Sequence, residues 1–422
     1  MKTDFIKKLK IGRTHTDQTT VLAVPLLFWV TGCLGILFGL WRLAFVAQAL
    51  LSGLVRQGTV LEAIHSFTLA GFTMVMMGAL YQLIPVLLNV PPVSPMRVVI
   101  QWMLYALGLV AFLLGLAIGA TWVLVCGGTG VVGGIVLFLA NVGGRIRRSR
   151  RFNVIALFLV TSLVYLFLTV IMGGFLVVRY TVANPSFPHE VPVHMTIALG
   201  GWFGLLVSGV SYRLWAMFGL KHREPQHWFG TWLLVNGAIV LWVVGLAAGL
   251  EVLRRAGWLF QGGAFVLYMA DILGAGLGDA RTMRDPALRT LVLSLAGLAI
   301  FEVLGTWAVF GHASRLWIAA WIAYGLGWVG MSFMGFSQKI VPFMVWLHRY
   351  AHVHGQGKMP RLPDIWRPGF AYPPMICAGV GLLCLLSSFM AESPRLFRIG
   401  GCCLAVFVRS GRPRRRWAAS ET

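Results

Sequence analysis

Long apolar stretches follow one another along this chain, and each is long enough to cross a lipid bilayer. A helix needs roughly 20 apolar residues to span the ~30 Å hydrocarbon layer. The sequence predicts twelve such spans, the last of them the shortest: 21–46, 62–88, 97–117, 119–143, 152–178, 191–217, 227–250, 257–280, 289–310, 315–347, 371–391 and 395–408. With 58% hydrophobic and 11% charged residues, the chain is too apolar for a single soluble core. We therefore expect an all-α polytopic membrane protein.

Basic residues gather next to the ends of the predicted spans. They form short blocks, KKLK near the start, RIRRSRR at 145–151 and RPRRR near the end, and most of the 35 Lys and Arg residues fall on the inner side if the amino terminus is cytoplasmic. This asymmetry is typical of the positive-inside rule. A net charge of +22 spread in this way argues against a nucleic-acid-binding domain.

The distribution of charge and hydropathy divides the chain into three parts. These are a cytoplasmic segment at 1–20, one transmembrane domain at 21–408 and a basic cytoplasmic tail at 409–422. Short loops and the absence of a targeting extension predict a prokaryotic inner membrane, with the lipid bilayer as the surrounding partner. The sequence leaves the oligomeric state open.

Three of the predicted spans share a local pattern that begins with glycine. The segments are GALYQLIP from Gly78, GVSYRLWA from Gly209 and GFSQKIVP from Gly335, which are 131 and 126 residues apart. Each interval contains four spans, so the pattern predicts three pseudo-repeated arcs of four helices, at about 21–143, 152–280 and 289–408. The alternative is chance, because small residues recur wherever membrane helices pack closely.

Two histidines lie near the starts of the second and sixth spans. His65 and His194 would sit at similar depth near the outer boundary of the membrane, and each is followed six residues later by a glycine, Gly71 and Gly200. Burial favours the neutral imidazole, which is a ligand for haem iron or copper. We expect a cofactor there, with the two glycines making room for a bulky planar group. The alternative is that each histidine caps a helix or bonds to a neighbour.

The segments that begin with these histidines, HSFTLAGFTMVMMGALYQLIP and HMTIALGGWFGLLVSGVSYRLW, resemble the catalytic subunit of haem-copper oxidases and nitric oxide reductases. That superfamily also has twelve helices in three arcs of four. The resemblance implies that His65 is an axial ligand of a haem b and that His194 is a ligand of haem or of a metal, copper being the second candidate.

The chain also departs from that superfamily. The family's seventh helix carries an adjacent histidine pair, whereas the seventh span here, WFGTWLLVNGAIVLWVVGLAAGL, has no histidine. The family's tenth helix carries two haem-ligating histidines, and the outer half of the tenth span has Trp321, Tyr324 and Trp328 instead. A complete oxygen-reducing centre is therefore not expected.

Asp271 and Glu302 lie well inside the predicted eighth and ninth spans. Intramembrane acids are costly and often functional. Because consecutive helices are antiparallel, we expect the two carboxyl groups at similar depth, either as a proton relay or as a neutral polar network.

Three functions follow from these features. The first is an oxidase-like protein that binds haem b and transfers electrons or senses a gas or redox state, with a quinone or a periplasmic cytochrome as its redox partner. The second is a proton-coupled transporter of a small molecule or ion that uses Asp271 and Glu302. The third is a haem-free structural subunit.

Overall fold

The computed structural model describes residues 21–149, 154–182, 189–218, 225–274, 285–311, 313, 316–350 and 372–409. The predicted cytoplasmic segment at 1–20 and nearly all of the predicted tail at 409–422 lie outside these residues.

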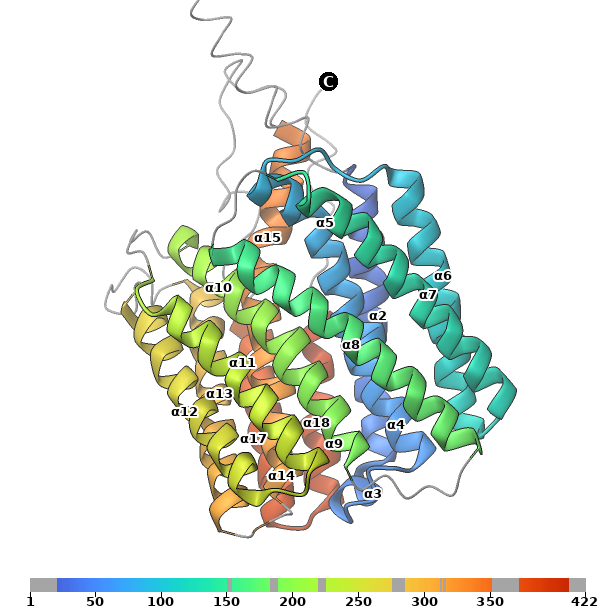
Figure 1. The fold of residues 1–422 in the computed structure, drawn as a ribbon, viewed down its shortest axis with the longest axis vertical. Coiled ribbons are helices and arrows are strands. Elements are labelled where there is room, and N and C mark those ends of the chain that lie inside the picture. Colours follow the sequence, from blue (N-terminus) through green and yellow to red (C-terminus); the bar gives the residue numbers. More distant parts are fainter. Residues whose placement is uncertain are drawn as a thin grey trace, which may run out of the picture.

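Helices make up the described part of the chain, and no strand occurs in it (Figure 1). In chain order they are α2 (Ala23–Phe45), α3 (Ala47–Leu51), α4 (Gly58–His65), η1 (Ser66–Thr73), α5 (Met74–Leu88), α6 (Pro95–Ile118), α7 (Thr121–Ile146), α8 (Val154–Val182), α9 (Glu190–Thr196), η2 (Ile197–Gly204), α10 (Leu205–Phe218), α11 (Trp228–Ala247), α12 (Glu251–Gly274), α13 (Pro286–Phe310), α14 (Leu316–Ile322), η4 (Ala323–Gly330), α15 (Met331–Tyr350), α17 (Tyr372–Met390) and α18 (Pro394–Arg409). The segments η1, η2 and η4 are π-helical and continue the helices on either side of them.

Eleven of the described helices are long and apolar enough to cross a membrane. The twelfth predicted span corresponds to α18, whose 16 residues reach about 24 Å at 1.5 Å per residue. The prediction of an all-α polytopic membrane protein is thus confirmed. The second span differs from its prediction, since α4 begins at Gly58 rather than at residue 62.

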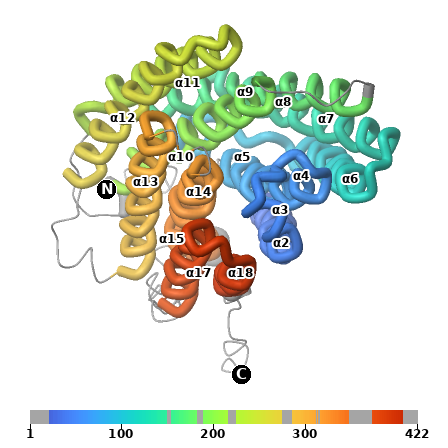
Figure 2. The backbone as a smooth tube through the Cα atoms, turned by 90° about the horizontal axis from the view of Figure 1, so that it is seen from below, coloured from blue at the N-terminus to red at the C-terminus, as the bar shows by residue number. Residues whose placement is uncertain are grey.

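The eleven long helices and α18 form three successive groups of four along the chain, and Figure 2 shows them following one another around the bundle. Within each group the first helix packs against the second and the third packs against the fourth. The fourth helix of each group also contacts the first helix of the next, and α18 returns to α2. The three groups therefore close into a ring, with the second helix of each group toward its centre.

Equivalent hydrogen bonds recur in the first two groups. The indole Nε1 of Trp102 donates to Oγ1 of Thr31 at 3.3 Å, and the indole Nε1 of Trp232 donates to Oγ1 of Thr161 at 3.1 Å. Both bonds join the third helix of a group to its first, and the paired residues are 130 positions apart in the sequence. Matching side-chain bonds of this kind agree with an internal repeat and are not expected from chance similarity of apolar helices.

The repeated glycines mark the points where the first and second helices of each group cross. A Cβ atom added at each glycine would lie within 2.6 Å of a side-chain carbon of the preceding helix: Gly78 against Phe28, Gly209 against Phe158, and Gly335 against Leu291. No residue larger than glycine fits at these crossings without a shift of the helices. Close helix packing accounts for this part of the sequence pattern.

The second helix of each group contains one π-helical segment. The segments begin at Ser66, Ile197 and Ala323, with the same spacings of 131 and 126 residues as the repeated glycines. π-helical turns are rare and are found frequently at functional sites. Their presence at one position in all three groups directs attention to the residues just before them.

Candidate functional site

His65 and His194 lie in the second helices of neighbouring groups, with His194 two residues before the position equivalent to His65. His65 is the last residue of α4, directly before η1, and His194 lies in α9, shortly before η2. Both helices start at the end of the bundle that also carries α3, at the bottom of Figure 1, and we call this end the histidine end. The structure thus places the two histidines singled out in the sequence at the same end of the bundle, in neighbouring groups.

One ring nitrogen of His65 is hydrogen-bonded. Nδ1 lies 2.7 Å from the carbonyl oxygen of Leu61 in the same helix. A carbonyl can only accept, so Nδ1 carries the proton and Nε2 keeps its lone pair. A ligating histidine commonly has this arrangement, in which one N–H donates to a carbonyl and the other nitrogen binds the metal.

His194 has a different environment. Its Nδ1 is fully buried and makes no hydrogen bond of good geometry to a described residue, although the imidazole lies near the backbone carbonyl of Thr169 in α8. Leaving a buried polar atom without a partner costs about 1–3 kcal/mol, so such atoms in native structures call for an explanation. A bound group that uses this imidazole would supply one.

The two imidazoles lie deep among protein atoms and still keep intermediate solvent-accessible area. A glycine of the preceding helix lies directly beside the His194 ring: a Cβ atom at Gly173 of α8 would meet only this ring, at 3.3 Å. On the other side, the ring of Phe112 packs against His65 with centroids 5.4 Å apart.

Gly71 and Gly200, the two glycines expected to make room for a planar group, face neighbouring helices. A Cβ atom at Gly71 would come within 2.6 Å of Ile36 in α2, and one at Gly200 would come within 3.3 Å of Ile239 in α11. Helix packing accounts for both. The glycine beside the His194 imidazole comes from a different helix than the histidines, so spacing along one span could not identify it.

Two ion pairs that the sequence reading missed lie beside the histidines. Arg42 Nε in α2 contacts Glu62 Oε2 at 2.6 Å, with the Glu62 side chain 3% exposed. Arg179 in α8 contacts Glu190 at 3.8 Å. Each pair joins the end of the first helix of a group to the start of the second, within one turn of the histidine. The available signal was an acid three or four residues before each histidine.

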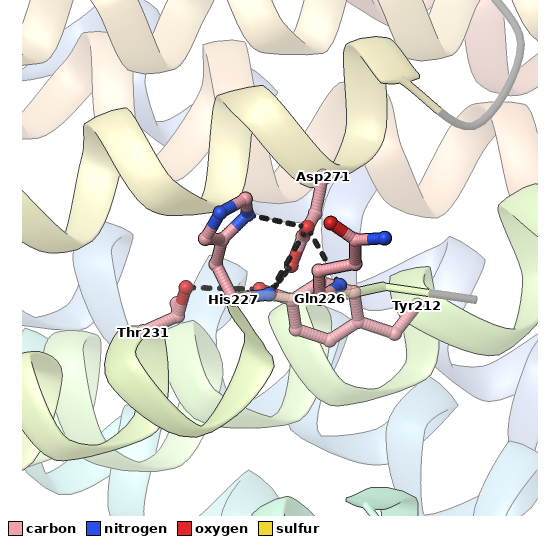
Figure 3. Close-up of polar contacts among 5 residues, drawn as sticks. All are labelled: Tyr212, Gln226, His227, Thr231 and Asp271. Atoms are coloured by element: carbon pink, nitrogen blue, oxygen red, sulfur yellow. Dashed lines mark hydrogen bonds and ion pairs between the residues drawn. The ribbon is translucent and has the colours of Figure 1, made fainter. Parts of the chain in front are cut away.

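Asp271 takes part in a separate cluster near the start of α11 (Figure 3). Its carboxylate accepts hydrogen bonds from the backbone N–H groups of Gln226 and His227, each at 2.9 Å, and contacts Nδ1 of His227 at 2.9 Å. A carboxylate at this place satisfies free N–H groups and complements the positive end of the helix dipole. Asp271 therefore anchors the start of α11.

Glu302 of α13 lies far from this cluster. Its Oε1 accepts from Nε2 of Gln261 in α12 at 3.0 Å. Since Gln261 precedes Asp271 by ten residues in the same helix, the two acids are separated by about 15 Å along it. The structure places Asp271 and Glu302 in two different polar contacts and does not bring them together.

Comparison with known proteins adds no assignment to this site. No model of a protein family matches the sequence, and no curated protein matches it either. In the part of the chain that the structure describes, no cluster of three or more His, Cys, Asp or Glu side chains could hold a metal ion. The histidine pair remains a two-ligand arrangement.

Proposed function

We propose that this protein is an integral membrane redox protein that holds a haem b between His65 and His194, in the leaflet at the histidine end. The observation that carries the proposal is the pair itself. Two imidazoles from the second helices of neighbouring groups lie at the histidine end, one with its Nδ1 proton directed to a carbonyl and the other with a buried Nδ1 that makes no hydrogen bond of good geometry.

The number of protein ligands favours haem over a bare metal ion. A structural zinc site takes four protein ligands, and a copper site of the blue type takes three or more. A porphyrin brings four nitrogens of its own, so two axial imidazoles complete the coordination of its iron. Copper therefore stays the weaker candidate.

The residues around the pair suit this role. The Arg42–Glu62 and Arg179–Glu190 pairs fix the starts of the two histidine helices against the preceding helices. Gly173 presents no side chain to the His194 ring, and Phe112 supplies an apolar wall beside His65. These residues orient the two rings and limit the access of water.

When bound, haem b would supply reversible one-electron chemistry. A quinone in the bilayer or a periplasmic cytochrome is the expected partner, and sensing of a gas or a redox state is the related role. Full oxygen reduction is not proposed, because α11 lacks the histidine pair of the haem-copper oxidases that the sequence resembles. Under this proposal the chain is a divergent relative of that superfamily.

The transporter reading has less support. A direct proton relay requires the two acids to be close, whereas Asp271 lies ten residues, about 15 Å, along α12 from Gln261, the hydrogen-bond partner of Glu302. Asp271 also has a structural task at the start of α11, where it accepts from two backbone N–H groups.

An optical spectrum tests the proposal directly. The protein is expressed with ample haem, purified in detergent and recorded before and after reduction with dithionite, beside His65→Ala and His194→Ala. His189→Ala is the matched control, since His189 is exposed and lies five residues before His194. Thermal midpoints of all four proteins show whether each variant is folded.

We expect a b-type spectrum in the wild-type protein and in His189→Ala. Each site variant should lose the low-spin haem signal while keeping a cooperative thermal transition. A colourless folded wild-type protein, or spectra that neither site variant changes, would contradict the proposal.

A further inference from the structure

A partly open cavity of ≈ 70 Å³ lies where α5, α10 and α15, from the second helices of the three groups, meet. Residues from α2, α5, α10 and α15 line it: Trp29, Val75, Met76, Ala79, Leu80, Leu83, Leu206, Val207, Val210, Leu214, Phe333, Phe336, Ser337 and Ile340. This site is separate from the histidine pair, and none of its lining residues belongs to the proposed haem site.

The lining follows the internal repeat. The residue directly after each repeated glycine lines the cavity, namely Ala79, Val210 and Phe336. The residue five positions after each repeated glycine also lines the cavity, namely Leu83, Leu214 and Ile340. The cavity is thus on the pseudo-threefold axis of the ring. Its three equivalent first positions differ in size, and Ala79, the smallest, leaves space that a larger side chain would fill.

Water has no suitable partners in this cavity. The only hydroxyl in the lining, Oγ of Ser337, donates its proton to the carbonyl oxygen of Phe333 at 2.5 Å. The indole Nε1 of Trp29 is fully buried and so is shielded from the cavity space. A water needs two to four polar partners, although a volume of about 10–15 Å³ is enough to hold one. The cavity is therefore large enough for water and too apolar to keep it.

We propose that this cavity binds small apolar molecules of the size of xenon or dioxygen. A dry cavity with an apolar lining gains dispersion contacts when such a molecule enters, without losing any hydrogen bond. Apolar gases also dissolve readily in the surrounding hydrocarbon, which supplies them to a site inside the bundle. Binding is reversible and non-covalent and does not depend on whether haem is present.

Xenon-pressurised crystals of the full chain test this site, because xenon is located by its anomalous scattering. The variant Ala79→Leu should fill the cavity, and Ala79→Val, which copies the residue of the second group, should fill it in part. Ala140→Leu is the matched control, since Ala140 is exposed on α7. Thermal midpoints establish that every variant is folded.

We expect a xenon peak between Trp29, Ala79 and Phe336 in the wild-type protein and in Ala140→Leu. Its occupancy should fall at least tenfold in Ala79→Leu and less in Ala79→Val, with no loss of thermal stability in the latter. Absence of the peak from the wild-type protein would overturn the proposal. A xenon peak of undiminished occupancy in folded Ala79→Leu and Ala79→Val would also overturn it. Neither result bears on the haem proposal, which the optical spectrum tests.

Discussion

At the scale of single residues, the sequence identified the two histidines but not the groups that hold them. His65 and His194 were recognisable because a polar side chain near the start of an apolar span is unusual. Their partners come from preceding helices, and the distance from Arg42 to Glu62 across a turn and a short helix could not be read from spacing. Such contacts depend on tertiary packing, which a single sequence does not display.

The Arg42–Glu62 ion pair is predicted to matter more than its counterpart in the second group. Glu62→Gln leaves a largely buried guanidinium without its carboxylate, and breaking a buried pair costs about 3 kcal/mol. Glu190→Gln should cost at most about 1 kcal/mol, because the Arg179–Glu190 pair is longer and partly exposed. Thermal or denaturant unfolding of both variants in detergent measures the difference. Equal losses would contradict this ranking.

Asp271 is predicted to act through its hydrogen bonds rather than through its charge. Asp271→Ala removes the acceptor for the backbone N–H groups of Gln226 and His227, and unsatisfied groups of this kind cost about 1–3 kcal/mol. Asp271→Asn keeps one acceptor oxygen and should lose less stability. The same unfolding measurement checks this order, and an asparagine variant as unstable as the alanine variant would show that the carboxylate charge is required.

At the scale of elements, hydropathy predicted the spans well because crossing a bilayer requires a length of apolar helix that few other structures need. The starts of helices were less certain: α4 begins before the apolar stretch does, since its first turn includes Gly58 and Thr59. The π-helical segments could not be predicted, because nothing in their composition separates them from α-helix. Only their repeated position, once seen, relates them to the glycine pattern.

The repeated glycines provide a test of the helix crossings. Gly78→Ala and Gly209→Ala each place a methyl group within 2.5 Å of a phenylalanine Cβ, and such overpacking typically costs about 1–3 kcal/mol. Gly143→Ala, where nothing lies within 4 Å, should be neutral or stabilise its helix by up to about 1 kcal/mol. Denaturant unfolding of the three variants in detergent measures these changes in stability. Tolerance of alanine at both crossings would mean that the helices are not packed as described.

At the scale of the whole molecule, three groups of four helices form a ring in which the first two groups repeat even individual hydrogen bonds. The glycine pattern predicted this arrangement. The Trp–Thr bonds that support it join helices that are not consecutive, so they could not be predicted from the sequence. The histidine pair and the cavity on the central axis both depend on how the groups face one another. Neither could be derived from one span at a time.

The orientation of the ring in the membrane is predicted from its charge and can be tested by labelling. The positive-inside rule predicts that the basic blocks are in the cytoplasm and the histidine end is outside. In a background without native cysteines, Ser52→Cys at the histidine end should react with a membrane-impermeant maleimide in intact cells. Ser94→Cys, exposed at the opposite end, should react only after lysis. The reverse pattern would contradict the expected topology.

The central claim is that His65 and His194 together hold one haem, and chemical rescue tests it most directly. His65→Gly and His194→Gly proteins loaded with haem are examined by electron paramagnetic resonance, with and without added imidazole. We expect a low-spin ferric signal in the wild-type protein, its loss in each variant, and its return when imidazole replaces the missing ring. A wild-type protein that takes up no haem, or a low-spin signal that persists in either variant without imidazole, would contradict it.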